Sequence, residues 1–364
     1  MTETTALVLT EVRGRIGCIT LNRARALNAL SLEMVRDIMA ALLQWQNDPA
    51  VLAVALRGSN KEGVFGALCA GGDIRFLHQA GSTGNPQLED FFTEEYALNH
   101  LIHHYPKPYI AFMDGIVMGG GMGISQGASA RIVTERTKMA MPETAIGLFP
   151  DVGGGYFLSR CPGRAGEWLG LTGDAIGAGD AIALKLADGF VPSAELPALW
   201  DALAAQEFAD SAAVQHWIDA RLGAAEAHVA GRQAEIDRFF ALPTVTAIVT
   251  ALEADGGDWA QATAATLRKR SPLMLHVVLE QVRRARGMGL AEDLRMERDM
   301  VRHCFYLRPG QSETVEGIRA LAVDKDHAPR WNPARIEDVQ DGQWQAFFAS
   351  PWPAHAHPLA ALAD

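Results

Sequence analysis

Residues 109–123 read Tyr-Ile-Ala-Phe-Met-Asp-Gly-Ile-Val-Met-Gly-Gly-Gly-Met-Gly. The apolar run 109–113 predicts a short buried strand, and Asp114-Gly115 predicts the turn that ends it. The glycines after Met118 follow a second apolar run and predict a tight turn that opens a helix. Backbone N–H groups at such a turn have no intrahelical partner, and glycine lets a ligand approach them closely. This stretch therefore indicates an α/β fold with backbone donors at a turn.

The alternation of strand and helix extends outward from this stretch. Apolar, β-rich runs recur in the first half of the chain, at residues 16–21, 51–56, 130–133 and 138–141. A helical pattern with Ser31 as its N-cap lies between the first two runs. After residue 155 the pattern becomes helical, so we expect an α/β core followed by a helical C-terminal region.

Changes in composition divide the chain into four expected parts. Residues 1–192 form the α/β core, and the Ala-, Glu- and Gln-rich residues 193–270 form a helical insertion. Helices begin again at Ser271-Pro272 and continue to about 335, and 336–364 form a weakly patterned tail. No internal repeat of fixed period is found.

Composition and charge limit the class of protein. The 364 residues are 49% hydrophobic and 21% charged, which is ordinary for a globular protein. A formal net charge of -11 argues against nonspecific binding to nucleic acid or to an anionic membrane. No apolar run is long enough to span a membrane, and the acidic N-terminus does not resemble a secretory signal. The four cysteines are widely spaced without C-x-x-C, so we expect no metal site and a cytoplasmic location.

Two acids stand in an apolar segment downstream of the first stretch. Residues 139–155 read Met-Ala-Met-Pro-Glu-Thr-Ala-Ile-Gly-Leu-Phe-Pro-Asp-Val-Gly-Gly-Gly, with Glu143 and Asp151 each directly after a proline. A carboxylate in apolar surroundings has its neutral form favoured, which suits proton transfer near neutral pH. A purely structural interpretation also holds, in which Glu143 caps a helix and Asp151 opens a turn.

Two glycine-rich turns precede the acids, at residues 68–73 and 118–123. Brought together, they would form an oxyanion hole from backbone N–H groups. Tight packing of helix on strand explains either turn equally well when it is considered singly.

Two further patterns are weaker. Residues 123–127 match G-x-S-x-G, but Ser125 is expected inside a helix rather than directly after a strand, which argues against an acylating serine. His100, His103 and His104 share helical spacing, yet no carboxylate–histidine template accompanies them, so a half-exposed helix face explains them more simply.

The chain resembles the crotonase (enoyl-CoA hydratase/isomerase) superfamily in the order of four motifs, Leu21-Asn-Arg-Ala-Arg-Ala-Leu-Asn-Ala-Leu30, Cys69-Ala-Gly-Gly-Asp73, Asp114-Gly-Ile-Val-Met-Gly-Gly-Gly121 and Met141-Pro-Glu143. The resemblance covers residues 8–192 and resumes at 271–272 and 316–326. It implies a spiral of ββα units with C-terminal helices, and binding of acyl-CoA thioesters. It places the oxyanion hole on the N–H groups of Ala70 and Gly120. The implied CoA-binding residues are Arg25, Ala70, Gly72, Asp73 and Lys325, so that residues 271–335 complete the CoA site.

Within the superfamily, residues 91–99 and 142–157 resemble the 3-hydroxyisobutyryl-CoA hydrolase branch. That resemblance implies that Glu143 and Asp151 are the catalytic pair. Glu95 is the implied substrate contact, together with Gly120 and the two catalytic acids. The hydratases carry a glutamate two residues beyond the triple glycine, and here that position is Gly123, which argues against water addition to a double bond.

The implied reaction is hydrolysis of 3-hydroxyisobutyryl-CoA to 3-hydroxyisobutyrate and CoA, a step of valine catabolism. Glu143 acts as nucleophile or as general base, and both roles stay open. We expect no cofactor beyond the CoA of the substrate, no nucleic-acid or membrane partner, and a possible homo-oligomer. The alternatives are a hydratase or isomerase that works with Glu143, and a non-catalytic acyl-CoA-binding protein.

Overall fold

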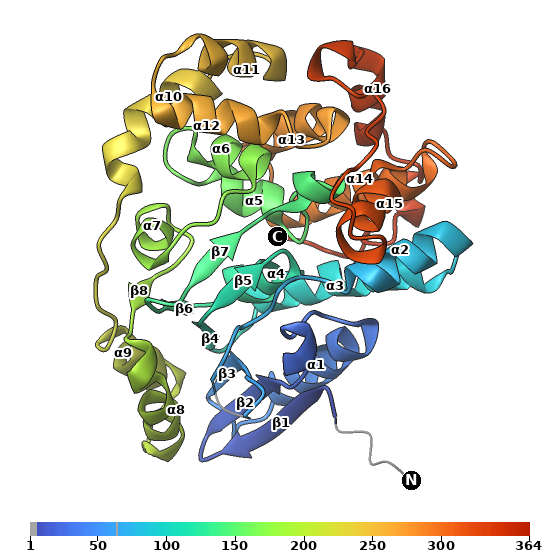
Figure 1. Ribbon diagram of the computed structural model, residues 1–364. Helices are drawn as coiled ribbons and strands as arrows, with labels where there is room; N and C mark the ends of the chain where they lie inside the picture. Colours follow the sequence, from blue (N-terminus) through green and yellow to red (C-terminus); the bar gives the residue numbers. More distant parts are fainter. Residues whose placement is uncertain (1–5, 63–64) are drawn as a thin grey trace. The chain divides into compact units, whose positions relative to one another are not determined.

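The computed structural model describes residues 6–62 and 65–364 (Figure 1). The chain forms two compact units and passes between them several times. Unit 1 comprises Met1–Gly72, Ala97–Met139 and Ile176–Ala230, and unit 2 comprises Asp73–Tyr96, Ala140–Ala175 and Gly231–Asp364. This division differs from the expected one, because residue 192 is not a boundary and the segment 193–270 is shared between the units.

Unit 1 is built on a six-stranded sheet in the order β1-β2-β3-β4-β6-β8. The strands are β1 Val8–Arg13, β2 Ile16–Leu21, β3 Ala53–Gly58, β4 Tyr109–Met113, β6 Ala130–Val133 and β8 Gly189–Phe190. β1 is antiparallel to β2, and the remaining pairs are parallel. The sequence predicts β2, β4 and β6 at these bounds and places β3 two residues early. The short strands β5 (Ile116–Met118) and β7 (Lys138–Ala140) form a second sheet.

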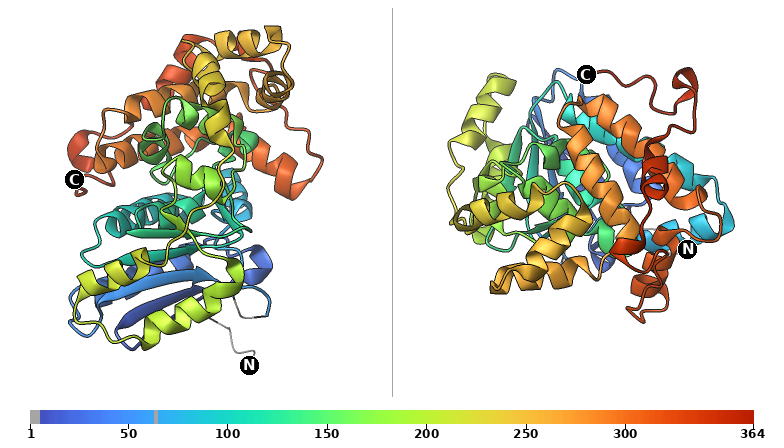
Figure 2. Two further views of the ribbon diagram at one scale, coloured as in Figure 1. Left: turned by 90° about the vertical axis from the view of Figure 1, so that its left-hand side faces the viewer. Right: turned by 90° about the horizontal axis from the view of Figure 1, so that it is seen from above.

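One face of the six-stranded sheet is covered by α8 (Leu196–Ala205) and α9 (Ser211–Asp219), as Figure 2 shows for unit 1. Side chains from alternate strand positions form one buried cluster with both helices, including Cys18, Ala55, Phe112, Ile132, Leu199, Trp200 and Val214. Burial of this apolar surface stabilises the sheet and the helices together. The expected insertion therefore contributes its first helices to the core of unit 1.

Helix α1 (Leu32–Trp45) also belongs to unit 1. Ser31 is its N-cap, as predicted, and its side chain accepts a hydrogen bond from Met34 N at 3.3 Å. A Cβ atom on Gly17 would lie 2.5 Å from the Trp45 ring. Glycine at this position of β2 therefore lets the indole of α1 pack directly on the strand. The remaining helices of this unit are α4 (Gly120–Gln126) and α7 (Ala178–Ala183).

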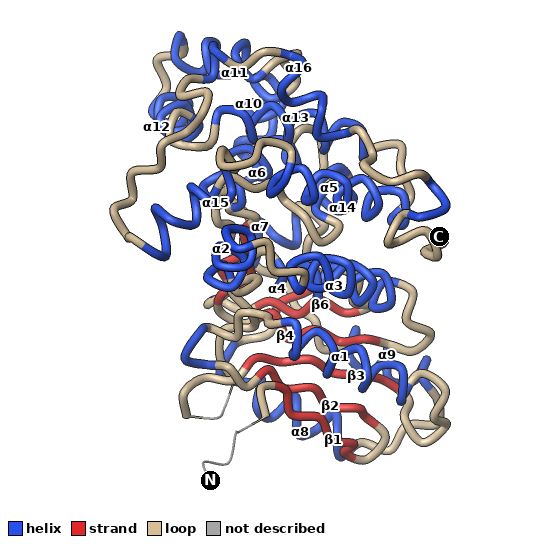
Figure 3. Tube along the Cα trace, turned by 90° about the vertical axis from the view of Figure 1, so that its right-hand side faces the viewer, coloured by secondary structure: helices blue, strands red, loops and turns tan. Residues whose placement is uncertain are grey.

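Unit 2 is helical apart from its loops (Figure 3). Its helices are α2 Ile74–Thr83, α5 Gly154–Ser159, α6 Ala165–Thr172, α10 Gln233–Phe240, α11 Val245–Ala254, α12 Asp258–Leu267, α13 Pro272–Ala285, α14 Leu290–Tyr306, α15 Glu313–Ile318 and α16 Asp341–Gln345. Helix α3 (Gln87–His103) begins in unit 2 and ends in unit 1. The buried α13 packs against α5 and α6, and Ser271 caps it as predicted.

Two further helices of unit 2 lie in the part of the chain, 271–335, that the sequence predicts to be helical. Helix α14 has 17 residues. Helix α15 ends at Ile318 and continues as a π-helical turn, Arg319–Val323. Across the described part of the chain, no helix combines the length and the apolar character needed to cross a bilayer.

Candidate active site

Three buried carboxyl groups gather in unit 2. Glu95 lies on α3, Glu143 is the first residue of the 3-10 helix Glu143–Ile146, and Asp151 lies in the loop before α5. The exposed fractions of Glu95, Glu143 and Asp151 are 2%, 6% and 6%. Charged side chains are rarely buried to this extent without a cationic partner, so a cluster of three acids points to chemistry rather than to stability.

The pKa values of these groups show that they lie close enough to interact. Burial raises the pKa of Glu143 well above its usual range, and the charge of Asp151 raises it further. Burial also raises the pKa of Glu95, followed by the charges of Asp151 and Glu143. Burial raises the pKa of Asp151 to about 6. Carboxyl groups with raised pKa values can give and take protons near neutral pH.

Tyr96 is a site residue that the sequence did not reveal. Its side chain is fully buried, and its hydroxyl donates a hydrogen bond of 2.8 Å to Asp151 Oδ2. This hydrogen bond favours the ionised carboxylate and so opposes the rise in the pKa of Asp151 that burial causes. Tyr96 directly follows Glu95, but adjacent residues of a helix face different directions, so sequence proximity gave no signal.

Two oxygen atoms of the cluster have unused hydrogen-bonding capacity. Glu95 Oε1 and Glu143 Oε2 are buried, and neither has a partner among the described residues. A buried polar atom without a hydrogen bond costs about 1–3 kcal/mol. Polar groups of a substrate, such as a hydroxyl or an attacking water, would supply the missing partners.

The two glycine-rich turns meet inside unit 1, as predicted. Cys69 N donates to Ile116 O at 3.0 Å, and Met118 N donates to Cys69 O at 3.0 Å. A Cβ atom on Gly121 would lie 2.4 Å from Cys69 O, so glycine is required for this close approach. The turns are thus held side by side at the start of α4.

The expected donor Ala70 is wrong. Its N–H already donates to Leu27 O at 3.0 Å, which leaves it unable to bind an oxyanion. In the described part of unit 1, the N–H groups of Gly72 and Gly120 have no acceptor. The structure therefore favours Gly72 with Gly120 as the donor pair. The sequence could not show this, because the Leu27 carbonyl approaches Ala70 only in the folded chain.

A sequence profile of the enoyl-CoA hydratase/isomerase family matches residues 16–348. The chain belongs to this family. Curated relatives include "3-hydroxyisobutyryl-CoA hydrolase, mitochondrial" from Xenopus tropicalis, which is 39% identical over 93% of this chain and 87% of the relative. The "3-hydroxyisobutyryl-CoA hydrolase 1" of Arabidopsis thaliana is 40% identical over 94% of this chain and 91% of its own length.

Solved structures of family members confirm the expected crotonase-like fold. A structure described as a carnitinyl-CoA dehydratase from Mycobacterium thermoresistibile has a TM-score of 0.87 and 38% identity, covering 95% of this chain and 97% of its own. One described as an enoyl-CoA hydratase from Rhodobacter sphaeroides has a TM-score of 0.85 and 40% identity, covering 95% and 98%.

The residues expected to bind CoA lie in both units. In unit 1, Arg25 is exposed within the 3-10 helix Ala24–Ala26. In unit 2, Lys325 is exposed with φ +58 after the π-helical turn, and the Asp73 side chain accepts a hydrogen bond from Phe76 N at 3.2 Å as the N-cap of α2. Asp73 thus has a structural role, and the CoA contacts of all three residues remain predictions.

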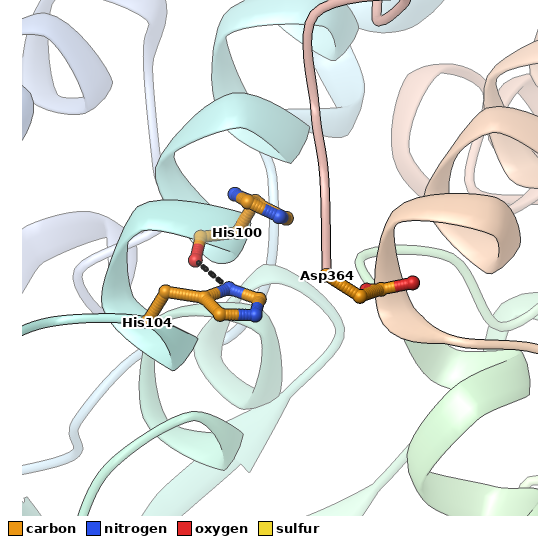
Figure 4. Close-up of side chains that lie close together, drawn as sticks. All are labelled: His100, His104 and Asp364. Atoms are coloured by element: carbon orange, nitrogen blue, oxygen red, sulfur yellow. Dashed lines mark hydrogen bonds between the residues drawn. The ribbon is translucent and has the colours of Figure 1, made fainter.

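The two weaker sequence patterns have structural explanations in this family member. Ser125 lies inside α4, where its hydroxyl is buried and donates to Gly121 O at 2.7 Å, so it is not placed as a nucleophile. The His104 ring stacks near that of His100, with His104 Nδ1 3.1 Å from the His100 carbonyl oxygen (Figure 4). Local helix contacts therefore account for this histidine pair. Asp364, also drawn there, belongs to unit 2.

Proposed function

We propose that this chain hydrolyses a short 3-hydroxyacyl-CoA thioester, with 3-hydroxyisobutyryl-CoA as substrate and 3-hydroxyisobutyrate and CoA as products. The observation that carries the proposal is the buried pair Glu143 and Asp151, in a chain about 40% identical to relatives named for this reaction. The raised pKa values of both acids suit proton transfer at neutral pH.

In the proposed reaction, attack on the thioester carbonyl forms an oxyanion that backbone N–H groups stabilise, with Gly72 and Gly120 as the candidates. Glu143 either attacks the carbonyl carbon, giving a mixed anhydride, or removes a proton from the attacking water. The C–S bond then breaks, and the leaving thiolate takes up a proton, with Asp151 as a candidate donor. In the mixed-anhydride route, water then cleaves the acyl bond to Glu143 and restores its carboxylate, with Asp151 as a candidate base. Water is the only co-reactant, so the atoms balance without a cofactor.

Glu95 would orient the substrate hydroxyl. It is buried beside the catalytic pair, and its Oε1 has no partner among the described residues. A hydrogen bond to a substrate hydroxyl selects strongly for substrates that carry it, because a substrate without it leaves the buried oxygen unpaired. This favours 3-hydroxyacyl over plain acyl thioesters.

A second candidate is hydration of an enoyl-CoA, because the two similar solved structures are described as a hydratase and a dehydratase. Position 123, where the hydratases are expected to carry their other glutamate, is a glycine in this chain. The partner proposed for Glu143 is instead Asp151. We therefore rank hydrolysis first.

Thiol release from a panel of CoA thioesters tests the proposal, with crotonyl-CoA hydration followed by loss of enoyl absorbance. We expect release from 3-hydroxyisobutyryl-CoA or 3-hydroxypropionyl-CoA to exceed crotonyl-CoA hydration. Glu143→Gln and Asp151→Asn should each lower kcat by about 10² to 10⁴ with little change in CoA affinity. Hydrolysis at wild-type rates in both variants would refute these roles.

The names of the relatives differ in what they say about the cellular compartment. The Xenopus relative is named mitochondrial, whereas the Arabidopsis relative's name gives no location. The cytoplasmic location, the absence of nucleic-acid and membrane partners, and the homo-oligomer stay predictions from the sequence.

A further inference from the structure

Two fully buried acids of helix α14 take no part in the proposed chemistry. Asp293 and Glu297 are both 0% exposed and stand four residues apart, so they lie on one face of the helix. Their carboxyl groups point at the backbone of the turn between Asp151 and α5, the segment that presents the catalytic aspartate.

Glu297 binds N–H groups of this turn and of the first turn of α5, and Asp293 binds one N–H group of α5. Glu297 Oε2 accepts from Gly153 N at 2.7 Å, and Glu297 Oε1 accepts from Gly155 N at 2.9 Å. Asp293 Oδ2 accepts from Tyr156 N at 2.9 Å. Two side chains of one helix therefore hold three N–H donors of the segment that follows Asp151.

Asp293 and Glu297 thus form a clamp on the segment after Asp151. Gln281 on α13 connects this clamp to Pro150, the residue before Asp151. Its Nε2 atom donates to Pro150 O at 2.6 Å and to Glu297 Oε1 at 3.1 Å. The residues on both sides of Asp151 are therefore held by side chains from two long helices. Rigid helices fix a functional group more precisely than a loop does by itself.

The conformation of the turn fits this holding role. Val152, directly after Asp151, has φ +58, which a β-branched residue adopts only under constraint. A Cβ atom on Gly155 would lie 2.3 Å from Asp293 Oδ1. Glycine at position 155 thus leaves room for the carboxyl group against the backbone.

The two acids of the clamp have unequal sets of donors. Glu297 receives three hydrogen bonds and Asp293 one, while Asp293 Oδ1 has no donor among the described residues. Burial raises the pKa of both groups, and the Gly155 and Gly153 N–H groups oppose that rise at Glu297. Glu297 is therefore the main acceptor on this segment, and Asp293 adds one further contact.

We propose that Glu297 is a positioning residue for Asp151, which it holds in place through the Gly153 and Gly155 N–H groups. The inference rests on the proposed function, since it assumes that Asp151 acts in thioester hydrolysis. Glu297 contacts neither substrate nor water in this role, so its loss should affect turnover rather than binding.

The test compares Glu297→Gln with Glu292→Gln in the full chain, by steady-state hydrolysis of 3-hydroxyisobutyryl-CoA. In Glu297→Gln, an amide N–H₂ group replaces one acceptor and faces a backbone N–H, so kcat should fall at least tenfold while KM stays within about twofold. Glu292→Gln is the matched control, because it makes the same chemical change at an exposed position of α14. Its kcat should stay within about twofold of wild type.

A second variant keeps the test decisive if Glu297→Gln does not fold. Gly155→Ala perturbs the same hydrogen bonds from the side of the turn, and it should show the same loss of kcat with unchanged KM. Wild-type kcat in Glu297→Gln, an equal loss in Glu292→Gln, or unfolding of both Glu297→Gln and Gly155→Ala would each overturn the positioning role. Wild-type protein that releases no thiol would instead refute the proposed function itself.

Discussion

Tyr96 Oη lies 2.8 Å from Asp151 Oδ2, so a buried phenol donates a hydrogen bond to a buried carboxylate within unit 2. The pKa of the Asp151 carboxyl group is altered by burial, by the Tyr96 hydroxyl and by a backbone hydrogen bond, and no cationic side chain contributes to the change. The tyrosine is therefore the side chain that stabilises the ionised form of Asp151.

Tyr96→Phe should raise the pKa of Asp151 from its value of about 6, because the ionised form loses its donor. Hydrogen bonds to charged groups contribute about 1.5–3 kcal/mol, so the pKa in the rate profile should rise by roughly one pH unit or more. The dependence of kcat on pH, measured between pH 5 and 9 with 3-hydroxyisobutyryl-CoA, checks this expectation.

Tyr109→Phe is the control for this substitution. Tyr109 is buried like Tyr96, but its hydroxyl has no partner among the described residues. Its removal should leave the pH profile unchanged. An unchanged profile in Tyr96→Phe as well would show that the hydrogen bond does not govern the ionisation of Asp151.

Glu143→Gln should stabilise the fold at alkaline pH although it lowers kcat. The folded-state pKa of Glu143 is raised above its usual 4.5. Such a group contributes stability that is fully present below the unfolded pKa and is lost as pH rises through the folded pKa. Glutamine stays neutral, so the gain appears at high pH and is absent near pH 4.

Calorimetry at pH 4.5 and pH 8 measures this effect. We expect the unfolding temperature of Glu143→Gln to exceed that of the wild type at pH 8 by a few degrees, since about 1 kcal/mol corresponds to roughly 2–4 °C in a chain of this size. The exposed Glu207→Gln is the matched control and should change neither value. Equal unfolding temperatures of Glu143→Gln and wild type at pH 8 would mean that burial of the ionised Glu143 carboxylate does not destabilise the fold.

Local signals in the sequence predicted the parts of the fold that depend on neighbouring residues. Ser31 and Ser271 cap helices where the pattern placed them, and the strand at 109–113 has its predicted bounds. A cap or a short apolar run is determined by a few consecutive side chains, so it can be recognised without knowing the fold.

The clamp on the catalytic turn could not be predicted in this way. Glu297 and Gly153 are 144 positions apart, and nothing local distinguishes Glu297 from a solvated acid on an amphipathic helix. Exposed charges such as Glu292 occur on the same helix. Only packing of α14 against the turn shows which acids are buried. The same reason explains the wrong assignment of Ala70, whose N–H is taken by the Leu27 carbonyl.

Gly121→Ala should separate the two glycine-rich turns of unit 1. A Cβ atom there would lie 2.4 Å from Cys69 O and 3.0 Å from Cys69 Cβ, so the backbone must move apart. Loss of one oxyanion donor typically lowers kcat by about 10² to 10³, and we expect a fall on that scale with a small change in KM. Steady-state kinetics on 3-hydroxyisobutyryl-CoA checks it.

Gly177→Ala is the control for this substitution, because a Cβ atom at that position meets no atom within 4 Å. It should retain wild-type kcat. If Gly121→Ala also retains it, the juxtaposed turns do not supply the oxyanion donors.

Arg25→Ala should weaken binding of the CoA thioester without slowing its hydrolysis. Arg25 is exposed on a protein of net charge -11, so a phosphate of CoA needs local cations of this kind to approach. An exposed ion pair contributes up to about 1 kcal/mol, which corresponds to a KM increase of roughly fivefold.

Because salt screens exposed charges, KM of the wild type should rise with ionic strength more steeply than KM of the variant. Arg335→Ala, which removes another exposed arginine, should match the wild type at every salt concentration. Identical salt dependence in Arg25→Ala and wild type would place the phosphate contact elsewhere.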